Sequence, residues 1–506
     1  MCGICGKIHF DKDKQISASL IQQMTETIIH RGPDDAGFYI KGNVGLGMRR
    51  LAIIDLAGGH QPIANEDETI WVVYNGEIYN YRQIQKELIQ QGHHFRTNSD
   101  TEVIVHAYEE YGVGCVEHFN GMFAFALWDE KKKQLMLARD RLGIKPLYYH
   151  FKNGDLSFAS EIKALLAATE TPREIDPQAL HDYLTLAFIP HPRTMFKRVK
   201  KLPPAHILIW QDGDIKIQRY WDLEAKIRER MTANSHVGML TSKEKKSRNS
   251  EADYLEQLRD ILTDAVEMRL MSEVPLGVFL SGGIDSSTIV GIISEWLKLP
   301  VKTFSIGFEG KGAVSELEFA RIVSDKFETE HYEQIVKPQA AEILPELLWH
   351  LDEPMSDPTA IPLYYLCQMA KEHVTVALCG EGGDETFAGY TRYYWDKKAE
   401  TYRHLPNPLR YIIHSFFESA VSKRLLPQEL ARRMQKFARN AGKSQEERYL
   451  DWHSIFSEHL KAEIYANGTL HELQDTGDIF TKYFSQTNGW DVLTRGQYVD
   501  INTISL

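Results

Sequence analysis

The sequence predicts two domains of different fold class, an α+β domain followed by an α/β domain with a doubly wound parallel sheet. A chain of 506 residues exceeds what one hydrophobic core normally serves. Short β-type runs with a few helices dominate up to about residue 210, whereas strands and helices alternate after residue 252. We therefore place the domains at residues 1–210 and 253–506, with residues 211–252 connecting them.

The first domain is predicted to be rich in strands that Gly, Asn and Asp interrupt. The strand-forming runs are "NVGLGMRRLAIID" (43–55), "TIWVVYNGEIYN" (69–80), "GMFAFALWDEKKKQLMLARD" (121–140) and "PLYYHFKNGDLSFAS" (146–160). We expect a helix over residues 81–92, ending at Gly92. A second helix is expected over residues 101–112, where Ser99 and Asp100 are candidates to cap its N-terminus.

The segment between the domains is polar, charged and weakly periodic over residues 225–252. We interpret it as an interdomain linker that is disordered around Thr241–Arg248. The alternative interpretation is a solvated surface loop within one domain. The linker is favoured because the sequence pattern changes sharply across it.

The second domain alternates strands and helices. Strands are predicted at "PLGVFL" (275–280), "VKTFSIGF" (301–308) and "HVTVAL" (373–378), and helices at "SSTIVGIISEWLKL" (286–299) and "FARIVSDKF" (319–327). Such alternation indicates a parallel sheet with helices on both faces. From about residue 395 onward the sequence is helical and irregular.

Composition excludes several classes of protein. The net charge of -12 argues against a nucleic acid or an anionic membrane as the main partner. No run of about 18 apolar residues predicts a membrane span, and the first residues do not resemble a signal peptide. The five sparse cysteines are Cys2, Cys5, Cys115, Cys367 and Cys379. An odd, sparse set fits a reducing compartment, so we expect a cytoplasmic protein.

The opening "MCGICGKIHF" allows two chemistries. Cys2 and Cys5 form a Cys-x-x-Cys pair, which is typical of metal or redox sites. A structural zinc site usually takes four ligands from two such pairs, and the sequence offers one. Alternatively, removal of Met1 would make Cys2 the N-terminal residue and give it a thiol and a free amine.

The loop "SGGIDSS" (281–287) lies between a predicted strand and a predicted helix, where a doubly wound sheet binds ligands. Its glycines let the backbone approach an anion, and the helix N-terminus favours phosphate. Asp285 suits Mg²⁺ that bridges phosphate oxygens. The loop matches neither Gly-x-x-x-x-Gly-Lys-Ser/Thr nor Gly-x-Gly-x-x-Gly. The alternative is an ordinary Gly-Ser turn.

A second loop, "CGEGGDE" (379–385), also follows a predicted strand. Its glycines permit close approach and its acids supply carboxylates, so Asp285 and Asp384 are predicted to share a magnesium ion. The stretch "LDEPMSDPTAIP" (351–362) is expected to bring further carboxylates to the same rim. They belong to Asp352, Glu353 and Asp357. Its prolines equally fit a fixed structural loop.

Together these motifs resemble the glutamine-hydrolysing asparagine synthetase family, over the chain from Cys2 to its end. The N-terminal half resembles class II, N-terminal-nucleophile (Ntn) amidotransferases. The "SGGIDSS" loop resembles the pyrophosphate loop of the PP-loop ATP pyrophosphatases. The resemblance implies antiparallel sheets layered between helices in the first domain and a PP-loop-type sheet in the second.

For the first domain the resemblance implies a glutamine site. Cys2 would be the nucleophile, with its α-amine as base, and Cys5 would have no catalytic role. "YNGEIYN" matches the oxyanion segment, "RRLAIID" the segment that holds the glutamine carboxylate, and "NSDTEV" the segment that binds the glutamine amine. The matching residues are Arg50, Ile53, Asn75, Gly76, Glu77 and Asp100. "HRGPDDAG" (30–37) is expected to support the pocket.

For the second domain the resemblance implies an ATP site. Its residues would be Leu280, Ser281, Gly282, Gly283, Asp285, Ser286, Ile306, Cys379 and Gly380. Glu381 would assist adenylation of the acceptor, and Asp285 and Asp384 would hold Mg²⁺. Many family members have serine where this chain has Cys379, so a backbone contact there is retained more readily than a side-chain contact.

The implied reaction is amidation of aspartate to asparagine. Ammonia from glutamine would displace AMP from a β-aspartyl adenylate, with ATP and Mg²⁺ required. The partners would be glutamine, aspartate and ATP, and we expect a homodimer. Two alternatives stay open: an amidotransferase for another carboxylate, and a glutaminase whose synthetase half is inactive. Family members continue past "NTISL", so a chain ending at Leu506 would be truncated, completed by another chain or impaired in synthesis.

Overall fold

A computed structural model describes residues 1–168, 171–237, 251–309, 316–337, 340–422, 437, 440–465 and 473–503. These residues form two compact units. Unit 1 contains Met1–Asp176 and His191–Gly380, and unit 2 contains Pro177–Pro190 and Glu381–Leu506. The predicted disordered segment Thr241–Arg248 lies outside the described residues.

The first sheet of unit 1 has the strand order β10-β8-β9-β1-β3-β2, and all neighbouring strands are antiparallel. The strands are β1 (Gly3–Ile8), β2 (Asp35–Lys41), β3 (Val44–Arg50), β8 (Tyr148–Lys152), β9 (Asp155–Ala159) and β10 (Lys200–Lys201). Two helices, α1 (Ala18–Glu26) and α4 (Ile162–Ala167), cover one of its faces.

The second sheet has the order β12-β11-β7-β6-β5-β4 and is also antiparallel throughout. Its strands are β4 (Ile63–Ala64), β5 (Ile70–Ile78), β6 (Gly121–Asp129), β7 (Gln134–Arg139), β11 (His206–Gln211) and β12 (Asp214–Arg219). The predicted helices are present as α2 (Tyr81–Gln90) and α3 (Glu102–Tyr111), which pack on one face of this sheet.

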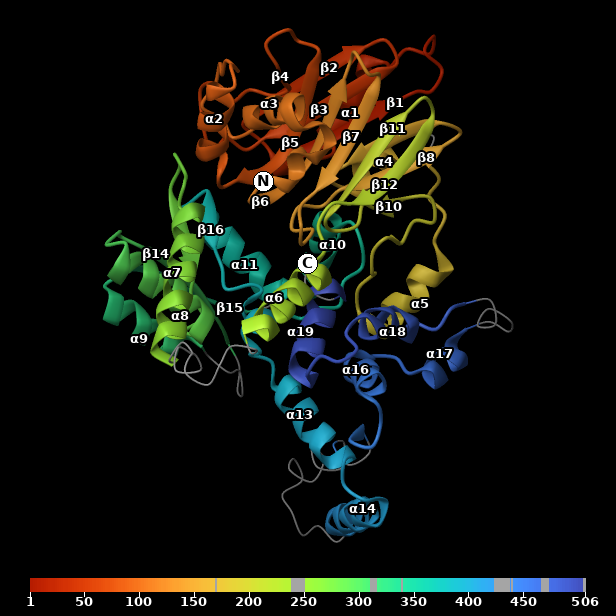
Figure 1. Ribbon diagram of the computed structural model, residues 1–506, viewed down its shortest axis with the longest axis vertical. Coiled ribbons are helices and arrows are strands. Elements are labelled where there is room, and N and C mark those ends of the chain that lie inside the picture. Colours follow the sequence, from red (N-terminus) through yellow and green to blue (C-terminus); the bar gives the residue numbers. More distant parts are fainter. Residues whose placement is uncertain are drawn as a thin grey trace. The chain divides into compact units, whose positions relative to one another are not determined.

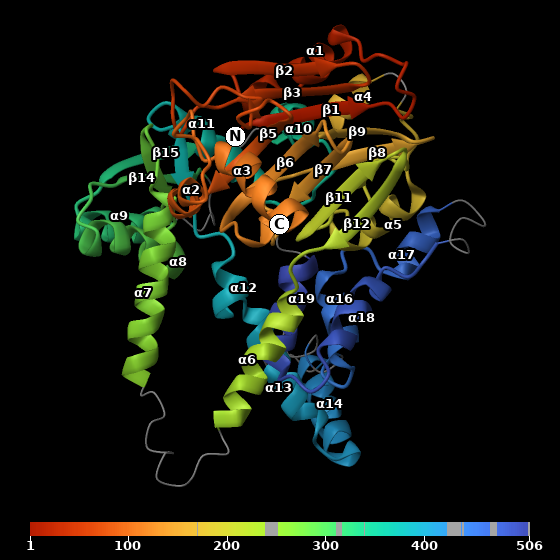
Figure 2. The same cartoon turned by 45° about the horizontal axis from the view of Figure 1, so that its top comes forward.

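The other faces of the two sheets meet in a shared apolar core, so that helices lie outside and sheets inside (Figures 1 and 2). The sequence of β5 is apolar almost throughout because both faces of the strand are buried. Val73 faces the first sheet, whereas Val72 and Tyr74 face α2 and α3. The predicted arrangement of antiparallel sheets between helices is therefore confirmed.

The remaining sheet of unit 1 is parallel, with the order β15-β14-β13-β16. Its strands are β13 (Leu276–Phe279), β14 (Lys302–Phe308), β15 (Glu330–Val336) and β16 (Val376–Leu378). Its helices are α7 (Glu251–Arg269), α8 (Ile284–Gly291), α9 (Leu317–Phe327), α10 (Ala340–Leu351) and α11 (Ala360–Lys371). Residues of α7, α8 and α9 share one apolar core, and residues of α11 pack with Phe304 in another. The predicted parallel sheet is confirmed, and Figure 1 shows α7, α8 and α9 beside it.

Two local features differ from the sequence-based expectations. The second sheet continues through β12 to Arg219, past the expected boundary at residue 210. The following helix α6 (Leu223–Val237) occupies the first part of the segment interpreted as a linker. α6 carries side-chain ion pairs, including Arg228 Nε to Glu224 Oε1 at 2.7 Å. Such pairs can stabilise a helix that has no periodic apolar face. The prediction relied on apolar periodicity, so it missed this helix.

The described residues of unit 2 are mainly helical. The helices are α5 (Pro177–Leu186), α12 (Gly383–Phe387), α13 (Thr391–Arg403), α14 (Asn407–Ser422), α16 (Gln445–His453), α17 (Glu458–Ile464), α18 (Gly477–Gln486) and α19 (Val492–Thr503). Buried charges join them: Arg448 pairs with Asp396 at 2.6 Å, and Asp500 pairs with Arg392 at 2.9 Å. In the described part of the chain, every helix is too short or too polar to cross a membrane.

Candidate active site

Unit 1 contains a cavity of about 280 Å³ at the end of its N-terminal sheets. All residues that the sequence assigned to glutamine lie on its wall. They are Cys2, Arg50, Ile53, Asn75, Gly76, Glu77 and Asp100. They come from the start of β1, the end of β3, the end of β5 and the turn before α3. Residues distant in sequence thus meet because β1 and α3 begin, and β3 and β5 finish, at the same place.

Cys2 and Cys5 lie on opposite faces of the first sheet. Cys2 packs against the core between the sheets, and Cys5 packs under α1 and α4. This follows from their separation by three residues in extended chain, which reverses side-chain direction. A shared metal or disulfide is therefore excluded by geometry in this conformation. The Cys2 Sγ lies 3.7 Å from the Leu51 carbonyl oxygen, and burial raises the pKa of the Cys2 thiol.

Asn75 presents an unusual side chain to the cavity. It is 1% exposed, yet its amide nitrogen and oxygen have no hydrogen-bond partner among the described residues. Buried polar groups are normally paired, and leaving one unpaired costs about 1–3 kcal/mol. An unpaired amide donor on a cavity wall indicates a ligand oxygen as its partner.

Gly76 is required by the neighbouring strand. A Cβ at this position would lie 2.3 Å from the Met122 carbonyl oxygen of β6. Any side chain would separate β5 from β6 at the residue beside Asn75, so the glycine fixes the position of the amide.

Arg50 is buried and held in one orientation. Its Nη2 donates to the carbonyls of Ile54 at 3.0 Å and Asp55 at 2.6 Å. A Cβ on Gly59 would lie 2.3 Å from the same Nη2, so the 54–59 loop packs closely around the guanidinium. A fixed guanidinium on the cavity wall suits a carboxylate ligand.

Two carboxylates, Asp100 and Glu77, line the same cavity as Arg50. Asp100 is buried and accepts hydrogen bonds from the Tyr74 hydroxyl at 2.9 Å and the Ile78 amide at 3.0 Å. Burial raises its pKa to about 6 despite these bonds. Burial also raises the pKa of Glu77 to about 7, with Lys145 opposing the shift and Asp100 adding to it. These acids are suited to a cationic ligand group.

The "HRGPDDAG" segment lies directly behind the cavity. Arg31 Nε donates to the Cys2 carbonyl at 2.9 Å, and Arg31 Nη1 donates to Glu161 at 2.9 Å. A Cβ on Gly32 would lie 2.5 Å from the Arg50 backbone nitrogen. The segment therefore fixes the backbone of both Cys2 and Arg50.

Lys145 is a cavity residue that the sequence analysis missed. It is 4% exposed, lines the cavity and places its Nζ 3.0 Å from the Met1 Sδ. Burial lowers its pKa, and Glu77 opposes that shift. A lysine within the run "LGIKPLYY" was the only available signal, and nothing local in the sequence shows that it is buried.

The "SGGIDSS" loop joins β13 to α8 as expected. Gly282 adopts φ +77°, and a Cβ there would lie 2.5 Å from the Phe319 backbone, so only glycine fits. The Ser281 and Ser286 hydroxyls lie 3.1 Å apart across the loop. The buried Ser287 hydroxyl has no hydrogen-bond partner among the described residues. A tight loop with hydroxyl and amide donors at a helix N-terminus fits a phosphate group.

The neighbouring ATP-site candidates of unit 1 lie close to this loop. Leu280 donates its backbone N–H to the Phe304 carbonyl at 2.9 Å, which aligns β13 with β14 two residues before Ile306. A Cβ on Gly380 would lie 3.0 Å from the Asp285 Cβ. Gly380 therefore brings the second loop against Asp285, and the exposed Cys379 precedes it.

The other acidic candidates divide into two groups. Glu381 and Asp384 belong to unit 2, where Gly382 has φ +83° and a Cβ on Gly389 would lie 1.9 Å from Asp384 Oδ1. Their proposed sharing of an ion with Asp285 stays a prediction.

The third acidic stretch is corrected by the structure. Asp352 pairs with Lys163 at 2.9 Å and Glu353 pairs with Lys201 at 2.8 Å. Asp357 accepts from the Thr359 amide at 2.8 Å within its own turn. Asp352 and Glu353 therefore compensate lysines and do not serve the nucleotide rim, whereas the place of the exposed Asp357 at that rim stays a prediction.

Comparisons with known proteins agree with this geometry. Residues 1–221 match the family described as glutamine amidotransferase domain, and residues 257–506 match asparagine synthase. Asparagine synthetase [glutamine-hydrolyzing] 1 of Bacillus subtilis is 36% identical over 99% of this chain and 75% of its own length. Putative asparagine synthetase [glutamine-hydrolyzing] 2 of Methanocaldococcus jannaschii is 38% identical over 81% of this chain and 80% of its length.

A further relative carries a different name. Amidase chry2 of Gibberella zeae is 33% identical over 76% of this chain and 57% of its own length. Relatives at this level of identity include differently named enzymes. The match therefore assigns a family and does not identify the carboxylic acid that accepts the nitrogen. The chain belongs to the glutamine-hydrolysing asparagine synthetase family.

Proposed function

We propose that this protein transfers the amide nitrogen of glutamine to the β-carboxylate of aspartate, with ATP converted to AMP and pyrophosphate. The observation that carries the proposal is the unpaired amide of Asn75 in one cavity with Cys2, Arg50 and Asp100. These residues match the four needs of glutamine hydrolysis: a nucleophile, an oxyanion donor, a cation for the α-carboxylate and an anion for the α-ammonium.

In the proposed glutaminase step the Cys2 sulfur attacks the glutamine carboxamide. The oxyanion that forms is stabilised by the Asn75 amide and the Gly76 backbone N–H. Collapse to a thioester releases ammonia, and water then hydrolyses the thioester to glutamate. Gly76 contributes by geometry, since the strand contact that excludes a Cβ also fixes its N–H.

Removal of Met1 would place a primary amine on Cys2, where it can accept the thiol proton. An N-terminal amine has an ordinary pKa near about 8. Burial lowers the pKa of the Met1 amine to about 6, with Lys145 and Arg31 acting in the same direction. That value belongs to the Met1 amine, and Cys2 opposes the shift. We propose that the amine of Cys2, once Met1 is removed, would meet the same burial, which favours its neutral and basic form at neutral pH.

In the proposed synthetase step the "SGGIDSS" loop binds the pyrophosphate portion of ATP, with the contacts predicted from Leu280 to Ser286. Adenylation is needed because a carboxylate is a poor electrophile. Asp285 and Asp384 would hold Mg²⁺, which offsets charge on the leaving pyrophosphate. Glu381 would assist adenylation, and ammonia would then displace AMP to give asparagine.

Ammonia must pass from the first site to the second. Part of the wall of the glutamine cavity is formed by Val376 and Ala377 of β16 and by Thr375, the residue before this strand. Cys379 and Gly380 follow on the same chain segment. The cavity thus extends toward the strand whose end carries the second loop, which supports internal transfer. We further propose that the protein acts in the cytoplasm as a homodimer.

A second candidate is an amidotransferase for a different carboxylic acid, and the match to Amidase chry2 favours considering it. Mass analysis of products formed from glutamine, MgATP and a panel of carboxylic acids decides between them. We expect asparagine and AMP with aspartate. AMP formation with another acid and none with aspartate would show that the protein is an amidotransferase for that acid. Glutamate release without any AMP would show that the protein acts only as a glutaminase.

Replacement of the nucleophile tests the first half. Cys2→Ala should lower glutamine-dependent activity by at least about 1,000-fold, since removal of a catalytic nucleophile is among the most costly substitutions. Ammonia-dependent product formation should persist, and retention of Met1 should mimic the variant. The measurement is glutamate release by each protein. Cys5→Ala is the control and should remain active; equal glutaminase activity of Cys2→Ala and wild type would refute the assignment.

Acid should weaken glutamine binding. Asp100 has a pKa of about 6 and Glu77 of about 7, so both lose their charge as the pH falls through these values. Without their charge, the attraction for the glutamine ammonium is lost, and KM should rise below about pH 6. Steady-state kinetics over this pH range measure the effect. Asp100→Asn should give a high KM with a weaker pH response, whereas a KM that stays constant in the wild type would contradict the assigned role.

Asp285→Asn should lower ATP turnover by more than about 100-fold, because a bound metal contributes several kcal/mol of charge stabilisation. Glutaminase activity should be spared, since Asp285 does not line the glutamine cavity. Pyrophosphate and glutamate release measure the two halves separately. Asp325→Asn, an exposed acid on α9, is the control. Loss of both activities, or of neither, would show that Asp285 does not have this role.

A further inference from the structure

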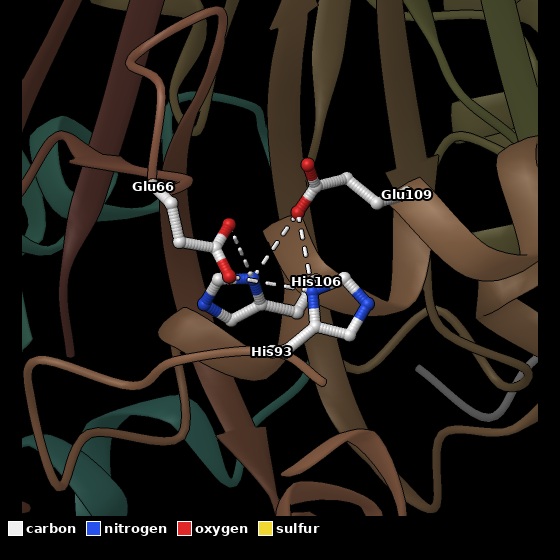
Figure 3. A group of neighbouring side chains, drawn as sticks. All are labelled: Glu66, His93, His106 and Glu109. Atoms are coloured by element: carbon white, nitrogen blue, oxygen red, sulfur yellow. Dashed lines mark hydrogen bonds and ion pairs between the residues drawn. The ribbon is translucent and has the colours of Figure 1, made fainter. Parts of the chain in front are cut away.

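Four side chains on α3 and on the two segments beside it converge on one point (Figure 3). Glu66 comes from the turn between β4 and β5, His93 from the loop after α2, and His106 and Glu109 from α3. We propose that these four residues bind one zinc ion and that this is a structural site. It is separate from the glutamine cavity, because none of the four lines that cavity.

Four distances between imidazole nitrogens and carboxylate oxygens lie near the edge length of a zinc tetrahedron, with Glu66 offering one oxygen to each histidine. His93 Nδ1 lies 3.4 Å from Glu66 Oε1 and 3.6 Å from Glu109 Oε2. His106 Nδ1 lies 3.4 Å from Glu66 Oε2 and 3.1 Å from Glu109 Oε2. Zinc bonds to nitrogen and oxygen of about 2.0–2.2 Å give tetrahedral edges of about 3.3–3.6 Å. One ion at the centre can therefore contact all four side chains.

Ion pairs alone account poorly for this pattern. Each imidazole nitrogen carries at most one proton. Yet each Nδ1 faces two carboxylates at similar distances, as Figure 3 shows for His106. One proton can serve one of these contacts well, whereas a central cation serves all four.

One of the two outer ring nitrogens has the partner that a metal site usually supplies. His93 Nε2 lies 2.9 Å from Glu110 Oε1, whereas His106 Nε2 is 3.6 Å from Glu102 Oε1 and makes no hydrogen bond among the described residues. Histidines that bind zinc typically direct the second ring nitrogen to a carboxylate, which fixes the tautomer and the ring orientation. Glu102 is itself held by the Arg96 amide at 2.8 Å and the Thr97 amide at 2.7 Å.

The two ligand carboxylates are oriented as well. Asn65 Nδ2 donates to Glu109 Oε1 at 2.8 Å, which turns Oε2 toward the histidines. The His94 backbone N–H donates to Glu66 Oε1 at 3.0 Å. The site is thus supported by hydrogen bonds before any ion is bound, as a specific site requires.

The types and number of the ligands indicate zinc and a structural role. Two imidazoles and two carboxylates are ligands that zinc accepts, and four protein ligands leave no position open for substrate. Bound zinc would join the turn that carries Glu66 and the loop that carries His93 to α3. The N-terminus of α3 follows Ser99 and Asp100, which line the cavity. Its role is to stabilise this part of the fold.

Direct zinc binding tests the inference. The full chain is stripped with a chelator, dialysed and titrated with ZnCl₂, and bound metal is measured. We expect one zinc per chain, and the same in a Cys2→Ala background, which removes the cavity thiol as a competing ligand. His93→Gln and Glu109→Gln should each bind at least about 10-fold more weakly, because even loss of an outer partner costs about 10–100-fold.

His94→Gln is the matched control, because His94 is exposed and its side chain is outside the cluster. It should bind zinc like the wild type. Cobalt(II) should give the strong visible absorption of four-coordinate cobalt in the wild type and lose it in His93→Gln. Absence of zinc binding, loss of binding only in Cys2→Ala, or equal binding by His93→Gln and wild type would each overturn the inference. The readout is bound metal, so the result is independent of the proposed amidotransferase reaction.

Discussion

An unsatisfied side-chain amide at the end of β5 is the feature on which the candidate active site depends. Burying the Asn75 amide without a partner costs about 1–3 kcal/mol, and folding must offset this from other contacts. The apolar core shared by the two sheets provides such contacts around β5. In return the amide is fixed before substrate arrives, the condition under which a donor best stabilises developing charge.

The same strand geometry brings the other groups to that amide. β1, β3 and β5 end near one cavity, so Cys2, Arg50 and Asn75 meet although they are far apart in sequence. Backbone contacts then restrict each of them. Three carbonyls surround Arg50, and the close approach of β6 excludes a side chain at Gly76. Orientation at this site is therefore a property of the sheets, and the side chains have little freedom of their own.

Strand and helix patterns are local signals, and they predicted the sheet types and the helices α2 and α3, whereas α1 and α4 were missed. The glutamine-site candidates came from the resemblance of the ordered motifs to a known family. Lys145 was missed because burial depends on the tertiary fold. The helix at Leu223–Val237 was missed because ion pairs stabilise it without an apolar period. Asp352 was misplaced because its lysine partner is 189 residues away. The histidine cluster joins three segments, and only His106 and Glu109 of α3 are near each other in sequence, so the full set of four could not be read from any one segment.

The central claim is that Asn75 donates to an oxyanion that develops in the transition state and the tetrahedral intermediate and is absent from bound glutamine. Steady-state glutaminase kinetics of Asn75→Ala test it most directly. We expect a fall in kcat of about 100- to 1,000-fold with a much smaller change in KM, because the lost interaction stabilises the transition state more than bound glutamine. An unchanged kcat with a raised KM would show that the amide only binds substrate, and would contradict the account.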